Sequence, residues 1–214
     1  MLRYGDHEDQ VVDVRGGGPT VLVLHGGFWR QPYAKDLMDD LCAALARDGW
    51  RAANVEYRRL GPGGYREMLD DVAAAAALLP GAVSLGHSAG GHLALWLASR
   101  GLVRGAVGLG AVCDLRAAAH ARLGNDAVRE LLGGDDDEAF DAADPAARLP
   151  FAAAQVLVHG SADDTVPVEH ARAYAARSGA ELVELDGVDH FEPIDPCSRA
   201  YPAVRDALSR ASGS

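Results

Sequence analysis

The chain contains a serine whose neighbours suit nucleophilic chemistry. Residues 86–90 are Gly-His-Ser-Ala-Gly, the G-x-S-x-G pattern that places a serine on a sharp turn between a strand and a helix. The apolar residues 82–85 precede the pattern and the apolar residues 93–98 follow it, so the expected strand and helix are both present. Small glycines allow a strand and a helix to approach closely, and the start of the helix directs backbone N–H groups at Ser88. The pattern predicts a nucleophilic serine.

Such a serine needs a base and an acid that orients the base. His190 stands in a loop near the C-terminus, after the strand-like residues 182–185, and we expect it to be the base and not a plain surface histidine. Asp163 and Asp164 follow the strand-like residues 155–159, and either carboxylate could accept a hydrogen bond from that histidine. Aspartates are also common in turns, so residue chemistry alone leaves the choice between the two open.

A third requirement is an oxyanion hole, the set of N–H donors that holds the negative charge of a tetrahedral intermediate. Residues 25–29, His-Gly-Gly-Phe-Trp, follow the strand-like residues 20–24, and glycines there allow close approach of the backbone to a substrate. We expect an N–H of Gly27 or of Phe28 to act together with the N–H of Ala89.

Two aromatic residues are candidates for substrate binding. Trp29 lies beside the predicted oxyanion loop, and Tyr57 follows a strand at the carboxyl edge of the expected sheet, where ligands tend to bind. For Tyr57 a structural role is the preferred interpretation, and substrate binding is the alternative. We expect His25 to brace its loop by hydrogen bonding, His87 to pack beside the serine and His159 to end a strand. The histidines do not follow the H-E-x-x-H zinc pattern, so neither a metal nor a cofactor is expected.

Strand-like and helix-like segments alternate along the chain, which predicts an α/β fold with a mostly parallel sheet and helices on both faces. Besides the strand and helix around Ser88, the expected strands cover residues 10–15, 20–25, 51–56, 103–110, 155–159 and 181–185, and the expected helices cover residues 35–48, 65–79, 169–177 and 199–210. Residues 61–64, Gly-Pro-Gly-Gly, predict a break before the second of these helices.

One long interruption lies between residues 112 and 151. It contains a helix-like stretch at residues 125–132 and the acidic run 135–138. We therefore expect a single domain over residues 1–214 with a small helical flap inserted here. The acidic run could bind calcium, but it lacks the spacing of an EF-hand, and we favour the N-terminus of a helix, whose dipole attracts acidic residues.

Composition excludes several classes of protein. The 214 residues are 49% hydrophobic and 24% charged, which argues against disorder. The formal net charge of −11 argues against a nucleic-acid partner, which requires a basic surface. The polar N-terminal residues predict no secretory signal, and the three scattered cysteines fit reduced thiols, so we expect a cytoplasmic protein that does not bind membranes. The oligomeric state is left open.

The chain resembles the α/β-hydrolase superfamily over essentially its whole length. Within it, the chain is most similar to the kynurenine formamidase (arylformamidase) group and neighbouring small esterases. Residues 25–29 are close to the H-G-G-Y-W of that group, and residues 86–93, G-H-S-A-G-G-H-L, are close to its G-H-S-A-G-A-H-L. Asp114-Leu115 and Asp189-His190-Phe191 also match. The chain departs from the group at Phe28, which replaces a tyrosine, and in its shorter flap.

The resemblance implies Ser88 as nucleophile, His190 as base and Asp163 as acid, since Asp163 precedes Val166-Pro167 as in the H-G-x-x-D-x-x-V-P loops of related hydrolases. It implies a serine hydrolase that acts on a small acyl substrate through an acyl-enzyme. The preferred substrate is an aryl formamide such as N-formylkynurenine, because Phe28 and Trp29 could exclude acyl groups larger than formyl. The alternatives are a general carboxylesterase for small acyl esters and a non-catalytic binding protein on the same fold.

Overall fold

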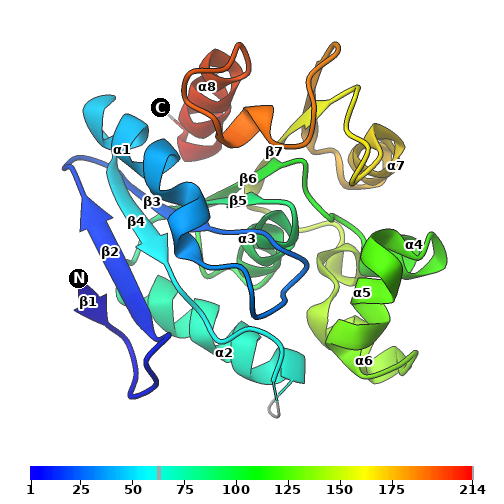
Figure 1. The fold of residues 1–214 in the computed structure, drawn as a ribbon. Helices are drawn as coiled ribbons and strands as arrows, with labels where there is room; N and C mark the ends of the chain where they lie inside the picture. Colours follow the sequence, from blue (N-terminus) through cyan, green and yellow to red (C-terminus); the bar gives the residue numbers. More distant parts are fainter. Residues whose placement is uncertain (62–63, 214) are drawn as a thin grey trace.

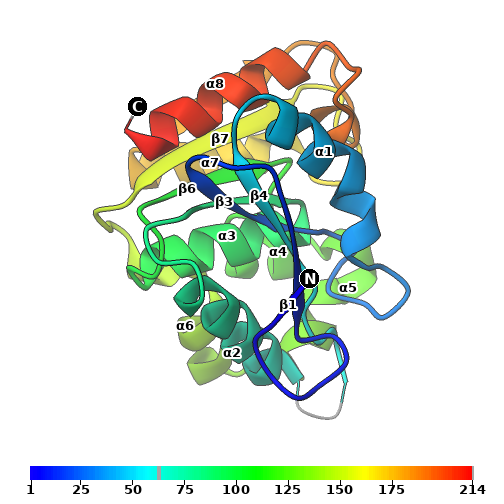
Figure 2. The same ribbon diagram turned by 90° about the vertical axis from the view of Figure 1, so that its left-hand side faces the viewer.

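The computed structural model describes residues 1–61 and 64–213, which form a twisted sheet between two layers of helices (Figures 1 and 2). The strands are β1 (Leu2–Arg3), β2 (Val11–Arg15), β3 (Thr20–Leu24), β4 (Arg51–Val55), β5 (Val83–His87), β6 (Gly105–Leu109), β7 (Ala154–Gly160) and β8 (Glu181–Leu185). Their order across the sheet is β1-β2-β4-β3-β5-β6-β7-β8. β2 pairs antiparallel with β1 and with β4, and the six strands β3 to β8 run parallel to one another. The predicted mostly parallel sheet is confirmed.

Alternate residues of the central strands point to opposite faces of the sheet, and both faces are covered. Val21 and Val23 of β3 pack into a cluster with α1 (Asp39–Arg47) and α8 (Tyr201–Ser212). Leu22 and Leu24 of the same strand pack into a cluster on the other face. That cluster includes residues of α2 (Gly64–Ala77), α3 (Ala89–Ser99) and α7 (Val168–Ser178). Burial on both faces explains why the central strands are apolar throughout.

The predicted flap lies between β6 and β7 and is helical. It consists of α4 (Leu115–His120), α5 (Leu123–Leu132), α6 (Asp137–Ala143) and the short 3₁₀ helix η2 (Pro145–Arg148). The acidic run begins α6, where the Asp136 side chain caps the backbone N–H of Glu138 at 3.4 Å. Among the described residues, no group of three or more His, Cys, Asp or Glu side chains is placed to hold a metal ion.

Several boundaries differ from the predicted ones. β1 was not expected, because two residues show no periodicity, and the predicted helix over residues 35–48 begins as the 3₁₀ helix η1 (Lys35–Met38) before α1. Of the predicted break, Pro62 and Gly63 lie outside the described residues. In the described part of the chain no helix is long and apolar enough to cross a membrane. The cysteines are free; Cys42 and Cys113 are buried and Cys197 is exposed.

Candidate active site

Ser88 occupies the turn between β5 and α3 in a strained backbone conformation, with φ 55° and ψ −118°. The turn is tight because the strand, the helix and β3 pack against one another through glycines. A Cβ atom on Gly86 would overlap the carbonyl of Gly90, and a Cβ atom on Gly90 would overlap the carbonyls of Leu24 and His25. The glycines of the G-x-S-x-G pattern are therefore required by space, as the sequence predicts.

His190 and Asp163 meet at the carboxyl edge of the sheet. His190 Nδ1 donates to Asp163 Oδ2 at 2.6 Å, and both side chains are buried. The other Asp163 oxygen accepts from the backbone N–H groups of Thr165 at 2.9 Å and Val166 at 2.8 Å. Asp164 is exposed, and among the described residues its carboxylate accepts a hydrogen bond only from the Thr165 hydroxyl. The structure thus places Asp163 beside His190, and the adjacent Asp164 away from it.

Asp163 carries a negative charge in spite of its burial. Burial by itself would raise the pKa of this carboxyl, but hydrogen bonds from His159 and His190 outweigh burial and hold the pKa well below its usual range. A buried carboxylate of this kind fixes the tautomer of its histidine partner, because Nδ1 must carry the hydrogen. His190 Nε2 is then left without a hydrogen in the neutral ring and can accept a proton.

The loop at residues 25–29 follows β3 and has an unusual backbone. Gly27, Phe28 and Trp29 all have positive φ, at 107°, 50° and 60°. Tyr33 packs so closely on Gly27 that a Cβ atom there would overlap the tyrosine side chain. Within the described residues, the backbone N–H groups of Phe28 and Ala89 make no hydrogen bond, so both are available as donors to a ligand.

A buried network of hydrogen bonds around His25 and Glu56 holds this loop in place. The buried His25 ring contacts Glu56 Oε1 through Nε2 at 3.0 Å and the Gly26 carbonyl through Nδ1 at 2.8 Å. Glu56 also accepts from the backbone N–H of Lys35 at 3.0 Å and from the Arg59 guanidinium. Burial opposes ionisation of Glu56, but its bonds to His25 and Lys35 and the charge of Arg59 lower its pKa.

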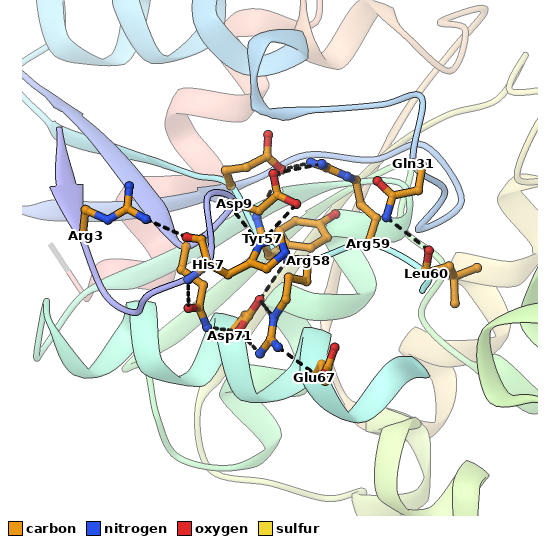
Figure 3. Close-up of polar contacts among 12 residues, drawn as sticks. Arg3, His7, Asp9, Gln31, Tyr57, Arg58, Arg59, Leu60, Glu67 and Asp71 are labelled. Atoms are coloured by element: carbon orange, nitrogen blue, oxygen red, sulfur yellow. Dashed lines mark hydrogen bonds and ion pairs between the residues drawn. The ribbon is translucent and has the colours of Figure 1, made fainter. Parts of the chain in front are cut away.

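Figure 3 shows the ion pairs of Arg58 and Arg59, which extend this network toward the N-terminal segment and α2. Arg59 also pairs with Asp9 at 3.1 Å, which connects the N-terminal segment to the loop after β4. Beside it, the Arg58 guanidinium binds both oxygens of the buried Asp71 on α2, at 2.7 and 2.9 Å. The paired charges fix the end of β4 and, through Glu56, the loop at residues 25–29.

Ser88 and His190 open onto one pocket of about 100 Å³. Its lining consists of Gly27, Phe28, Tyr33, Leu37, His87, Ser88, Thr165, His190, Phe191 and Ile194. Apart from the two histidines, none of the described residues in this lining carries an ionisable acid or base except the Tyr33 phenol. The pocket therefore suits a small, uncharged group.

Comparison with known proteins concerns the fold that carries these residues. The model of the prolyl oligopeptidase family matches residues 80–184, and among curated proteins no sequence matches the chain. A candidate thioesterase from Silicibacter is similar in structure, with 21% identity, 97% of this chain and 84% of that chain covered, and a TM-score of 0.82. A truncated carbohydrate esterase from gut microbiota has 16% identity, 100% and 95% coverage and a TM-score of 0.80.

A third similar structure is esterase B from Lactobacillus rhamnosis, inhibited by a tributyrin phosphonate. The two chains are 17% identical, the match covers 99% of this chain and 84% of the esterase chain, and the TM-score is 0.77. The chain has the α/β-hydrolase fold. Ser88 follows β5, Asp163 follows β7 and His190 follows β8, which is the chain order Ser, Asp, His typical of this fold.

Trp29 and Tyr57 do not line the pocket. This corrects the expectation that they bind substrate and, for Tyr57, agrees with the structural role. The Tyr57 hydroxyl donates to the His25 carbonyl at 2.7 Å, and its ring stacks on His25 with the ring centroids 4.3 Å apart. The Trp29 indole donates to His92 Nδ1 at 3.3 Å. Both side chains are fully buried. Both side chains belong to the hydrophobic core, and their hydrogen bonds fix the loop at residues 25–29 to it.

Two further histidines, His159 and His87, contact Asp163 and His190, and the sequence did not predict these contacts. The ring of His159 lies with Nε2 2.8 Å from the Val166 carbonyl and 3.3 Å from Asp163 Oδ2, so one N–H is shared between two acceptors. His87, predicted only to pack beside Ser88, also donates through Nε2 to the backbone carbonyl of His190 at 2.9 Å. The four-residue spacing from His159 to Asp163 was the available signal for the first contact.

The pocket residues Tyr33, Leu37, Phe191 and Ile194 were not predicted either. Leu37 lies in η1, and Ile194 lies in the short 3₁₀ helix η3 (Glu192–Ile194). The pattern of residues 35–48 predicts a helix but not that Leu37 reaches the pocket, and η3 is too short for a periodic pattern. Only the position of Phe191 next to His190 indicated a role.

Proposed function

We propose that this protein is a serine hydrolase that cleaves esters of small acyl groups through an acyl-enzyme. The observation that carries the proposal is the 2.6 Å hydrogen bond from His190 to Asp163 beside a pocket that also contains Ser88 on its strained turn. The similarity of the fold to proteins named as esterases supports it. A protein that only bound ligands would not need a histidine oriented by a buried carboxylate beside a serine on a strained turn.

The proposed reaction has two halves. Ser88 Oγ attacks the acyl carbon while His190 Nε2 takes the hydroxyl proton, since Nδ1–H is already bonded to Asp163. The N–H groups of Ala89 and of Phe28 or Gly27 receive the oxyanion, and His190 then gives its proton to the leaving oxygen as the acyl–oxygen bond breaks. Water attacks the acyl-enzyme in the same way, with His190 as base, and releases the acid and free Ser88.

The pocket favours an ester with a small, uncharged acyl group. Its volume of about 100 Å³ leaves little room for a long acyl chain beside Ser88. An aryl formamide such as N-formylkynurenine is the second candidate, because formyl is the smallest acyl group. That molecule carries an ammonium and a carboxylate, and the described lining offers neither a carboxylate nor a Lys or Arg side chain to pair with them. We therefore rank the ester first.

A substrate panel tests the proposal. We expect purified protein to hydrolyse p-nitrophenyl acetate and butyrate faster than N-formylkynurenine, and Ser88→Ala to abolish all turnover. Formamide turnover above ester turnover would replace the first candidate by the second. Absence of Ser88-dependent turnover, together with no labelling of Ser88 by a fluorophosphonate, would refute a serine hydrolase and leave a binding protein.

A further inference from the structure

Exposed apolar side chains gather at the mouth of the candidate active site. Few large apolar residues of the described surface are exposed, and three of them border this one pocket: Tyr33 is 42% exposed, Leu37 43% and Phe191 62%. Ile194 completes the group and is half-buried. We call these four residues the apolar shelf. Apolar surface costs free energy in water, so a cluster of it beside a reactive serine indicates a surface that is covered when the protein acts.

The shelf lies on the side of the pocket where a leaving group must depart. The Phe191 ring packs edge-on against the His190 ring, with the centroids 5.2 Å apart, and it also lies 5.8 Å from the His87 ring. In the proposed reaction His190 gives its proton to the leaving oxygen, so that oxygen and the chain attached to it lie beside His190. A chain that continues outward from there passes over Phe191.

We propose that the apolar shelf binds the alcohol portion of the substrate, and that this portion is an uncharged apolar chain. The inference rests on the proposed function and adds the substrate class: short-acyl esters of apolar alcohols. The enclosed part of the pocket holds the acyl group, and the open shelf removes the alcohol chain from water.

Charge argues against a lipid surface as the occupant of the shelf. The protein has a formal net charge of −11, which an anionic membrane would repel. Lys35, the basic residue of η1, already pairs with Asp13 at 2.5 Å and is not free to bind a headgroup. A single substrate chain does not need the basic side chains or the large apolar area that membrane binding requires. The described lining of the pocket contains no Lys or Arg.

Two series of esters separate the alcohol side from the acyl side. The first series is ethyl, butyl, hexyl and octyl acetate, and the second is p-nitrophenyl acetate to octanoate. For the wild-type protein we expect kcat/KM to rise along the alcohol series and to fall along the acyl series. In Phe191→Ala and Leu37→Ala the ratio of kcat/KM for hexyl acetate to that for ethyl acetate falls about tenfold, which is the effect of losing one buried apolar contact.

Leu78→Ala and Leu102→Ala serve as matched controls, because these leucines are 44% and 39% exposed and do not line the pocket. We expect both controls to keep the wild-type ratio. If Phe191→Ala and Leu37→Ala keep the wild-type ratio of hexyl to ethyl acetate, or change only the acyl series, the apolar shelf does not bind the alcohol portion. Turnover of ethyl acetate in the same experiment would still support the proposed hydrolase function. A dimer that Leu37→Asp separates into monomers would also overturn the assignment of the shelf to the alcohol portion, since the shelf would then be a contact between copies.

Should no ester be turned over, the proposed function fails and the shelf is tested by binding alone. NMR shifts of Tyr33 and Phe191 in Ser88→Ala protein then report whether hexanol binds and ethanol does not. Equal or absent shifts with both alcohols would refute the apolar shelf as a binding surface.

Discussion

Asp163 and Asp164 are adjacent in the chain, but only Asp163 contacts His190. We predict that Asp163→Asn lowers kcat on the order of 10³–10⁴-fold, because an amide can no longer hold the Nδ1–H tautomer of His190. Asp164→Asn is the matched control and is expected to leave kcat within about twofold, since its carboxylate is exposed. Steady-state kinetics on p-nitrophenyl acetate distinguishes the two. Equal losses would mean that the hydrogen bond to Asp163 does not orient the base.

His159 is a positioning residue for Asp163. We predict that His159→Leu lowers kcat about tenfold with little change in KM, because Asp163 Oδ2 loses one of its two histidine donors. Loss of that donor also raises the pKa of Asp163. The acid limb of the pH profile of kcat therefore moves to higher pH. His159→Gln retains an N–H donor and should restore part of the loss. A purely structural role would lower stability without moving the pH profile.

At the scale of elements, the contact between α3 and β3 depends on Gly90. We predict that Gly90→Ala destabilises the fold by about 3 kcal/mol, because its Cβ would overlap the backbone carbonyls of Leu24 and His25, which cannot move aside. Gly17→Ala is the control, since nothing lies within 4 Å of a Cβ at that position. Urea unfolding measures both. A Gly90→Ala protein as stable as Gly17→Ala would show that the turn at Ser88 tolerates separation of the helix from the sheet.

The elements that the sequence predicted well are those whose signals are local. The buried strands appear as unbroken apolar runs, and β8 has the predicted bounds, Glu181–Leu185. The turn at Ser88 is predicted because its glycines, its strand and its helix all lie within about seventeen residues of one another. The flap is predicted from the long interruption between residues 112 and 151, which contains a helix-like stretch at residues 125–132.

The missed features depend on contacts between distant segments. Tyr57 and His25 are 32 residues apart, so no local pattern shows that the tyrosine turns inward to stack on the histidine. The shelf residue Leu37 and the pocket residue Ile194 come from two short 3₁₀ helices at opposite ends of the chain. Strand and helix patterns locate the edge of a sheet, but they do not say which side chains from other segments reach that edge.

For the whole molecule, buried histidines predict sensitivity to mild acid. Burial lowers the pKa of His87 from 6.5 to about 3 and that of His92 from 6.5 to about 4, and it also lowers the pKa of His170. The rings of His87 and His92 stay neutral in the folded protein at pH 5, whereas in the unfolded chain they bind protons below pH 6.5. Unfolding therefore takes up protons in this range, and stability is complete above pH 6.5 and falls as the pH drops toward 4.

Asp144 has the opposite effect. Burial and the neighbouring Asp114 raise its pKa from 3.8 to about 6, so at pH 5 the folded protein holds a proton on Asp144 that the unfolded chain releases. His87 and His92 take up about two protons on unfolding and Asp144 releases about one. The difference is about one proton, to which His170 adds, so the free energy of unfolding should fall by at least about 1.4 kcal/mol per pH unit near pH 5.

Substitutions separate these contributions. We predict that Asp144→Asn makes the loss of stability between pH 7 and pH 5 steeper, because the compensating proton is gone, and that His92→Gln makes it shallower. Urea unfolding at pH 7, 6 and 5 measures the three slopes, and each variant is compared with itself across pH, so its overall loss of stability does not matter. A wild-type free energy of unfolding that stays constant from pH 7 to pH 5 would contradict the prediction, because the neutral histidines of the core would then be protonated in the fold as readily as in the unfolded chain.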